Sequence, residues 1–318
     1  MEETRGRDRR AALVYNPMAG RRKARLGEAV AAALAEEGWQ VEVHPTDAPG
    51  GALPLARQLA AGGVVDTVFA LGGDGTLREV AEGLLGTEVA LAPLPGGTTN
   101  VFVRSLGLPA DPVAAARIAA ACPPRPICVG TCNGRPFLMM VSLGFDAAVV
   151  AAMDGGLKAR WGQLGVAWTG VPAWWRYRYR AVGVEGAGPR AEAPYVAVCN
   201  IPHYGGPWCL APGACCDEAS LEIVLFRRPG RLASLSFLRD LARGRHQLRP
   251  DVEIRRAEGE LLLDGPADVP IQIDGDRFVG GLPLSVGIAP RPLAVLAPAV
   301  AARNPDERPP RTAEPAGS

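Results

Sequence analysis

Three apolar runs in the first hundred residues each end in a short stretch of small and polar residues, and this feature restricts the fold most. The runs at 11–15, 66–71 and 89–92 lead into residues 16–20, 72–76 and 96–100. Segments with helical spacing lie between them, such as Leu77, Val80, Ala81 and Leu84. Strands that alternate with helices predict a parallel sheet, and the loops beyond its carboxyl ends lie together and bind ligands.

The length of 318 residues exceeds what one hydrophobic core usually organises, so two domains are expected. Alternating strands and helices predict an α/β nucleotide-binding domain over residues 11–125. The expected strands are 11–15, 39–44, 66–71 and 89–92, and the expected helices lie near 26–34, 53–61 and 77–85. Short apolar runs then follow, separated by glycine, proline and aspartate, at 127–131, 136–143, 195–200, 221–226 and 284–288. They predict a second domain of antiparallel strands over residues 126–290, with one helical exception at 158–180. Residues 1–10 and 304–318 are predicted to be flexible tails.

Composition narrows the class of protein. A net charge of +1 gives no overall attraction to nucleic acid or to an anionic membrane. The seven cysteines lack the paired CxxC spacing of a zinc site and follow no signal peptide, which favours a reduced, cytoplasmic compartment. No uncharged apolar run reaches the roughly 20 residues that cross a bilayer.

The glycine-rich loops have the chemistry of a phosphate site. Gly72, Gly73 and Gly75 let backbone N–H groups at a helix start approach phosphate oxygens, and Thr76 and Thr98 add hydroxyl groups. Asp74 is the exception, because a carboxylate beside a polyphosphate needs a cation or a sugar hydroxyl between them. The alternative is that each glycine-rich turn only ends a strand. The P-loop and GxGxxG patterns are absent, which argues against P-loop enzymes and dinucleotide-binding dehydrogenases.

Taken in order, these motifs resemble the diacylglycerol kinase catalytic-domain family, which includes sphingosine and ceramide kinases. The resemblance is carried by five segments: Asn16-Pro17-Met18-Ala19-Gly20, residues 71–80 around Gly72-Gly73-Asp74-Gly75-Thr76, Pro95-Gly96-Gly97-Thr98-Thr99-Asn100 with Arg104, Gly144-Phe145-Asp146, and Ile273-Asp274-Gly275-Asp276. The GGDGT loop alone also occurs in NAD kinases and phosphofructokinases. The ordered combination is more specific.

The resemblance implies an N-terminal α/β domain, a C-terminal β-sandwich, ATP in the cleft between them, and a last segment, 291–303, that returns to the first domain. It assigns nucleotide contacts to Asn16, Thr46, Gly72, Gly73, Asp74, Gly75, Thr76, Thr98 and Asn100. It assigns the proton acceptor for a lipid hydroxyl to Asp276, a role that phosphoryl transfer also requires on chemical grounds. Asp274-Gly275 between apolar runs is equally typical of a hairpin turn, after which Asp276 would be an ordinary solvated residue.

The resemblance also implies Mg²⁺, both with ATP and at a structural site within residues 211–221. The expected ligands there are the carboxylates of Asp217 and Glu218 and the carbonyl oxygens of Cys215 and Ser220. The family usually has aspartate where this chain has Gly213, and Asp-Gly where it has Glu218-Ala219. A solvated acidic turn is the alternative.

A lipid kinase must work at a membrane surface, so peripheral membrane association is expected. Residues 158–180 mix tryptophan, tyrosine and arginine, which suits a headgroup interface; the alternative is a helix that packs its aromatic side chains into the core. The expected reaction is ATP-dependent phosphorylation of a lipid hydroxyl, diacylglycerol to phosphatidate. The alternatives are a soluble-substrate kinase and a non-catalytic nucleotide or lipid sensor. The residues do not fix the lipid or the oligomeric state, a homodimer included.

Overall fold

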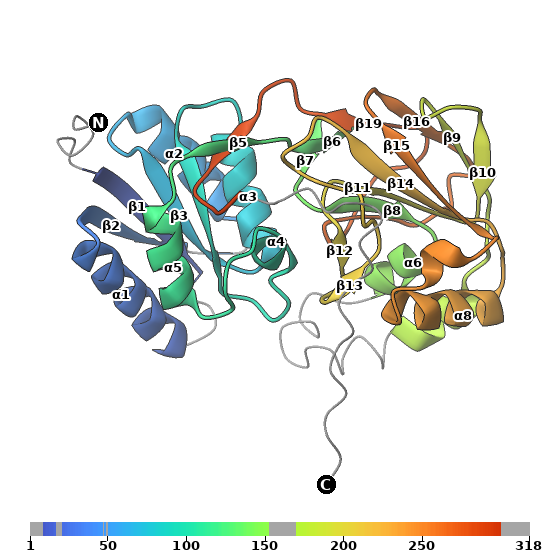
Figure 1. Ribbon diagram of the computed structural model, residues 1–318, viewed down its shortest axis with the longest axis horizontal. Helices are drawn as coiled ribbons and strands as arrows, with labels where there is room; N and C mark the ends of the chain where they lie inside the picture. Colours follow the sequence, from blue (N-terminus) through green and yellow to red (C-terminus); the bar gives the residue numbers. More distant parts are fainter. Residues whose placement is uncertain (1–8, 17–20, 47, 49, 153–169, 300–318) are drawn as a thin grey trace, which may run out of the picture.

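The computed structural model describes residues 9–16, 21–46, 48, 50–152 and 170–299 (Figure 1). Its first sheet has the strand order β2-β1-β3-β4-β20-β5. The strands are β1 (Arg9–Tyr15), β2 (Trp39–Pro45), β3 (Thr67–Gly72), β4 (Ala90–Pro95), β5 (Arg125–Ile127) and β20 (Leu293–Val295). All neighbours pair in parallel except β20 and β5. The chain thus crosses the second half of its length before β20 completes this sheet.

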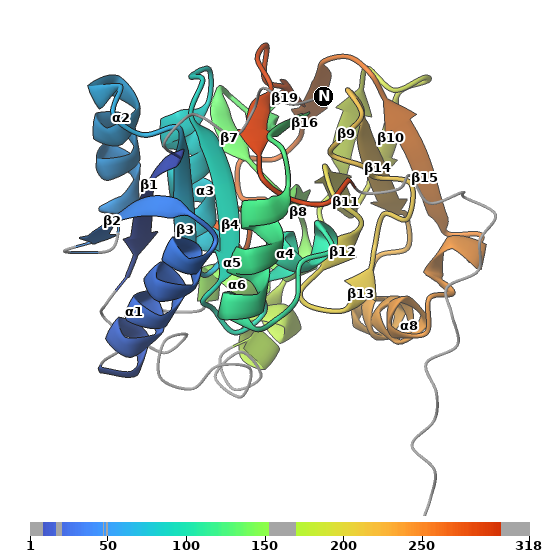
Figure 2. The same cartoon turned by 60° about the vertical axis from the view of Figure 1, so that its left-hand side comes forward.

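Helices cover both faces of the parallel sheet. They are α1 (Arg21–Glu36), α2 (Ala52–Gly62), α3 (Asp74–Leu84), α4 (Val101–Ser105) and α5 (Pro112–Ala121). Helices α1 and α5 pack together, and α2 and α3 pack together, on opposite faces (Figures 1 and 2). Strands β3 and β4 are consequently buried along their whole length, which explains why they read as continuous apolar runs instead of alternating ones.

Two antiparallel sheets of six strands form the second half. One has the order β10-β9-β16-β19-β6-β7 and the other β15-β14-β11-β8-β17-β18. The first contains β10 (Ala191–Ala193), β9 (Val182–Glu185), β16 (Leu261–Asp264), β19 (Leu284–Ile288), β6 (Gly130–Cys132) and β7 (Arg135–Phe137). The second contains β15 (Val252–Ala257), β14 (Leu221–Phe226), β11 (Tyr195–Cys199), β8 (Met140–Leu143), β17 (Ile271–Ile273) and β18 (Asp276–Arg277). A short hairpin, β12 (His203–Tyr204) and β13 (Trp208–Cys209), is separate from both.

The second of these sheets is buried on both faces. On β14, Ile223 and Leu225 face the apolar layer between the two sheets, whereas Val224 and Phe226 face outward. Helices α6 (Phe145–Ala152) and α8 (Arg231–Ala242) cover that outer face (Figure 1). Phe237 of α8 stacks on Phe226 with ring centroids 4.7 Å apart. A short 3₁₀ turn, His246–Leu248, follows α8.

The predicted fold class, a parallel α/β sheet followed by an antiparallel sandwich, is confirmed. Several details differ. The run at 136–143 forms two strands, β7 and β8. Helices α5, α6 and α8 were not predicted, because α5 and α6 have one charged residue each and α8 has leucines on both faces, so their helical periodicity is weak. Of the predicted helix at 158–180, residues 170–176 are helical and 177–180 are irregular, while 158–169 lie outside the described residues. Arg9 and Arg10 begin β1 instead of belonging to a tail. The rest of the predicted tails, residues 1–8 and 304–318, lies outside the described residues. The predicted return segment is described through residue 299.

Candidate functional site

Two glycine-rich loops touch each other at the carboxyl ends of β3 and β4. The N–H of Gly96 donates to the carbonyl oxygen of Gly72 at 2.8 Å. A Cβ atom on Gly96 would lie 2.8 Å from the Gly72 nitrogen, and one on Gly97 would lie 2.7 Å from the Gly73 Cα. The glycines are therefore required by the close approach of two backbones, and the loops form one rigid unit.

The Asp74 side chain links the two loops through hydrogen bonds. Its carboxylate accepts hydrogen bonds from the N–H groups of Val101 at 3.2 Å and Phe102 at 3.1 Å, and from the Thr99 hydroxyl at 3.3 Å. The negative charge therefore lies at the start of α4, where unpaired backbone N–H groups favour it. This contact explains the carboxylate in the loop without a cation or sugar beside it. Asn100 also shapes the loop, because its side chain bonds both the N–H and the carbonyl of Gly97.

A pocket of about 190 Å³ opens beside the start of α3. It brings together four of the residues predicted to contact nucleotide: Asn16, Thr46, Gly75 and Thr76. The other five, Gly72, Gly73, Asp74, Thr98 and Asn100, do not line this pocket and instead build the adjoining loops, where Thr98 is exposed.

Glu79 also lines the pocket, and sequence reasoning missed it. Its carboxylate accepts the N–H of Ala52 at 3.2 Å, and burial raises its pKa. Glu79 lies three residues after Thr76 on α3, so the two side chains share one helix face. That spacing is the signal by which Glu79 could have been found.

Asp276 lies over the first turn of α3. Its Oδ2 atom would be 3.7 Å from a Cβ on Gly75, so the carboxylate faces the Gly72–Thr76 loop directly. The Nη2 atom of Arg78 donates to the same oxygen at 3.1 Å. The Arg78 side chain is only 7% exposed and that of Asp276 is 44% exposed. The pair joins α3 of the parallel sheet to β18 of the antiparallel sheet, and the Arg78 Nε atom is buried with no hydrogen-bond partner among the described residues.

A tight hairpin places Asp276. Asp274 and Gly275 have φ values of 52° and 80°, and Ile273 pairs with Asp276 across the turn. The sequence prediction of a two-residue hairpin is confirmed, and Asp276 follows it as the first residue of β18. The hairpin turn therefore also sets the approach of Asp276 to the Gly72–Thr76 loop.

Asp274 anchors that hairpin. Its buried carboxylate accepts the N–H groups of Leu138, Met139 and Met140 at 2.8, 2.9 and 3.0 Å. Burial raises its pKa to about 6 despite these bonds. Because these three hydrogen bonds come from backbone N–H groups, Asp274 holds the hairpin in place and thereby positions Asp276.

Asp146, part of the motif that suggested the family, is also buried. It accepts the Ser142 hydroxyl at 2.6 Å and the N–H of Ala147 at 2.6 Å, and burial raises its pKa. These contacts hold the start of α6 against β8.

The predicted metal ligands do not assemble into a metal site. Cys215, Glu218 and Ser220 line a second cavity of about 920 Å³, which lies between the end of α4 and residues 212–222. Asp217 forms an ion pair with Arg125, and Glu218 forms one with Arg256 at 2.7 Å. The Cys215 carbonyl accepts the N–H of Glu218, as in an ordinary turn. Across the described part of the chain, no three histidine, cysteine, aspartate or glutamate side chains are grouped to hold a metal ion.

Guanidinium groups thus pair with both carboxylates that were predicted to bind a divalent cation. Arg125 also donates to the carbonyl oxygens of Ala297 at 3.0 Å and Pro298 at 2.8 Å. A positive charge already neutralises each carboxylate of this segment, so the residues present do not fit a structural Mg²⁺ ion.

The aromatic residues near 174–179 divide between core and surface. Trp174, Tyr177 and Tyr179 pack against the main core, whereas Trp175 is 57% exposed. Core packing, the alternative interpretation of this segment, therefore holds for those three side chains, while a role at a headgroup interface stays a prediction. Trp161 and Trp168 lie outside the described residues. Within those residues, no helix combines the length and hydrophobicity that crossing a membrane requires.

The chain matches two known domain families and several known proteins. Residues 10–132 match the diacylglycerol kinase catalytic domain, and residues 139–297 match the YegS C-terminal NAD kinase beta sandwich-like domain. A "Probable lipid kinase YegS-like" of Pseudomonas putida is 33% identical over 77% of this chain and 84% of its own length. A "Diacylglycerol kinase" of Bacillus subtilis is 29% identical over 75% of this chain and 80% of its own.

Several solved structures share this architecture, among them the following one. The crystal structure of a diacylglycerol kinase from Bacillus anthracis superposes with a TM-score of 0.69 and 21% identity, covering 92% of this chain and 98% of that one. At this identity the likeness establishes the shared fold and carries no statement about the substrate.

Proposed function

This chain belongs to the lipid kinase family that shares the diacylglycerol kinase catalytic domain, and from that premise we propose that it transfers the γ-phosphoryl group of ATP to the hydroxyl of a membrane lipid. The proposed substrate is diacylglycerol and the product phosphatidate. The observation that carries the proposal is the position of Asp276, a carboxylate that faces the phosphate-type loop at the start of α3.

Nucleotide binding is assigned to the loops around α3. The pocket lined by Asn16, Thr46, Thr76 and Glu79 would hold the nucleoside end of ATP, and the glycine loops beside it would receive the phosphates. Gly73 is the N-cap of α3, so unpaired backbone N–H groups and the helix dipole favour negative charge there. Mg²⁺ would enter as part of the MgATP substrate and not through residues 211–221.

The chemical step is assigned to Asp276. Phosphoryl transfer depends on alignment and charge stabilisation, with one group that orients the attacking hydroxyl and accepts its proton. The half-exposed Asp276 carboxylate is accessible to such a hydroxyl, and the Asp274 hairpin fixes its position. Arg78 would orient the carboxylate and add positive charge beside the phosphoryl group being transferred.

The cellular setting belongs to the same proposal. A diacylglycerol substrate remains in the bilayer, because each buried methylene contributes about 0.8 kcal/mol to its retention. The enzyme would therefore act as a cytoplasmic protein that associates peripherally with a membrane. A homodimer is compatible with this function and is not required by it.

A panel of acceptors, each offered alone, tests the proposal. Purified protein is incubated with MgATP labelled in the γ position and, in separate reactions, with dispersed dioctanoylglycerol, other lipid alcohols, NAD and a sugar phosphate. Label in a chloroform-soluble phosphatidate is the expected result. Label in NAD or the sugar phosphate would establish a soluble-substrate kinase instead, and label in no acceptor would favour a non-catalytic protein.

A further inference from the structure

Helix α8 has one face that no other element of the described residues covers. Ser234, Phe237 and Leu241 are buried against the sheet, whereas Leu232 is 83% exposed and Leu235 is 49% exposed. Leucines usually fill the buried face of such a helix, so two on the opposite face form an apolar patch that calls for an explanation.

Residues 170–176 extend this patch. Val171 is 56% exposed and Trp175 57% exposed. The Arg231 guanidinium lies over the Trp175 ring, 4.5 Å from its centroid, and its Nε atom donates to the Trp175 carbonyl at 2.7 Å. The Ser234 hydroxyl bonds the Tyr179 hydroxyl at 3.0 Å. These contacts fix the two segments together, so their exposed apolar side chains form one surface, called the α8 face below.

Positive charge surrounds the apolar patch. Residues 227–249 contain seven arginines and a single acidic residue, Asp240. Leu232, Leu235, Arg239 and Arg243 follow one another at intervals of three and four residues, which places them along one stripe of the helix. Arg228, Arg231 and Arg243 are exposed. Within the described ranges none of the three forms a close ion pair, although Arg228 is near enough to Asp251 to help Arg249 lower the pKa of that carboxyl.

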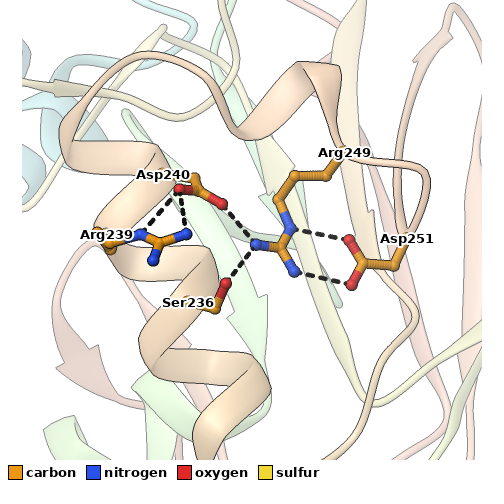
Figure 3. A network of polar contacts seen from close by, with 5 residues as sticks. All are labelled: Ser236, Arg239, Asp240, Arg249 and Asp251. Atoms are coloured by element: carbon orange, nitrogen blue, oxygen red, sulfur yellow. Dashed lines mark hydrogen bonds and ion pairs between the residues drawn. The ribbon is translucent and has the colours of Figure 1, made fainter.

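Asp240, the one acidic residue in 227–249, is paired with two arginines (Figure 3). Asp240 accepts from Arg249 at 2.6 Å and from both Nε and Nη2 of Arg239, at 3.1 and 3.0 Å. Arg249 also binds Asp251 through two bonds of 2.8 Å and the Ser236 hydroxyl at 2.8 Å. This network fastens α8 to the chain entering β15 and neutralises Asp240, so the remaining charge of the α8 face is positive.

We infer that the α8 face is the surface by which the protein docks onto an anionic phospholipid bilayer. An interfacial helix combines apolar side chains that enter the headgroup boundary with arginines that attract anionic lipids, and tryptophan prefers the same depth. Nucleic acid would use the arginines but not four exposed apolar side chains.

The inference rests on the proposed function and adds to it. Helix α6 packs against β18, which begins with Asp276, and its Phe145 ring lies 6.3 Å from Phe237 of α8. Helices α6 and α8 lie on the same side of the antiparallel part (Figures 1 and 2). A bilayer bound at α8 therefore meets the same layer of helices that adjoins the proposed proton acceptor.

Vesicle sedimentation tests the inference. The full chain is mixed with vesicles of phosphatidylcholine alone or with added phosphatidylglycerol, and the bound fraction is measured. Wild-type protein should bind the anionic vesicles more strongly. The pair R228Q/R243Q should lose roughly fivefold per arginine, and L232Q/L235Q about tenfold or more. The matched controls V64Q and R10Q, which change exposed residues of the parallel-sheet part, should bind like wild type.

Each outcome separates the two proposals. Unchanged binding by both α8 variants, or no preference of wild type for anionic vesicles, overturns the inference. Dissociation of a dimer by L232Q/L235Q without any vesicle binding would make the face an interface between copies and also overturns it. Dispersed dioctanoylglycerol needs no docking, so variants that bind vesicles poorly should phosphorylate it at the wild-type rate. Normal vesicle binding with no phosphorylation would sink the kinase proposal while leaving the docking face intact.

Discussion

Arg78 and Asp276 should behave as one energetic unit, and their coupling can be measured. The perturbations are R78M, D276A and the double variant. The pair lies 3.1 Å apart with a buried guanidinium and a half-exposed carboxylate. At an effective dielectric constant of about 20, two unit charges 4 Å apart interact by about 4 kcal/mol. Solvent at Asp276 reduces this toward the value of about 1 kcal/mol found for exposed pairs.

The two single variants should differ in cost. D276A leaves the Arg78 charge buried without its partner, so the free energy of unfolding should fall by about 2 kcal/mol, below the 3–5 kcal/mol lost when a fully buried pair is broken. R78M leaves a carboxylate that water can reach, so its cost should stay under about 1 kcal/mol. Because the double variant removes both charges, it should be more stable than the sum of the single effects predicts, with a coupling of about 1–2 kcal/mol.

Urea unfolding followed by tryptophan fluorescence measures these free energies. If the losses in unfolding free energy of R78M and D276A add up to that of the double variant within about 0.5 kcal/mol, the two residues are not coupled and the reasoning is refuted. Activity separates catalysis from stability. R78M should lower kcat by about 100-fold through a displaced carboxylate, with nucleotide Kd unchanged. The double variant should regain stability but no activity.

Three further predictions follow from the geometry. Burial lowers the pKa of His246, whose Nε2 donates to the Leu210 carbonyl. As the pH falls below about 6.5, the unfolded chain therefore takes up a proton at this histidine before the folded chain does, and the folded state loses stability. The free energy of unfolding of wild type should fall more steeply from pH 7 to 5 than that of H246Q, and equal slopes would contradict this. G96A should lower the free energy of unfolding by about 1–3 kcal/mol and weaken ATP binding, because the added Cβ would collide with Gly72. The control G62A, where the added Cβ has open space, should change neither quantity. Thermal melts measure the stability and calorimetry measures ATP binding. In the absence of nucleotide, replacing Mg²⁺ by EDTA should leave Tm unchanged, since arginines pair with the carboxylates of residues 211–221. A Tm several degrees higher with Mg²⁺ would contradict this and support a bound metal ion there.

The local patterns of the sequence predicted the parallel sheet and its loops. Strand ends with glycine are visible along the chain, and the order of the strands places those ends on one edge, so the meeting of Asn16 and Thr76 could be predicted, whereas Thr46 came only from the family resemblance. The Asp274-Gly275 hairpin was also readable, because a two-residue turn with positive φ is a local property.

Contacts between distant residues were not predictable. Arg78 and Asp276 are 198 residues apart, and Arg125 and Asp217 are 92 apart. Such pairing depends on how the two halves of the chain pack, which no spacing rule contains. The resemblance of residues 211–221 to a family stretch implied a metal at Asp217 and Glu218, and it could not show that arginines from elsewhere in the chain pair with both carboxylates.

Helix α8 was missed for a different reason. Leucines lie on both its faces, so its hydrophobic pattern is weak, and its identity depends on the Phe226 and Phe237 contact with the sheet. The same two-sided pattern is what exposes Leu232 and Leu235. The feature that hid the helix in the sequence is therefore the one that indicates its proposed role.

The most direct test of the central claim compares phosphoryl transfer with nucleotide binding in D276N. This variant keeps the shape of the side chain and an oxygen for Arg78, but lacks a carboxylate to accept a proton. Transfer from labelled ATP to dioctanoylglycerol should fall by about 10²–10⁴-fold, while ATP Kd stays within about twofold of wild type. Transfer by D276N at the wild-type rate would contradict the assignment of Asp276 as proton acceptor, and with it the proposed mechanism.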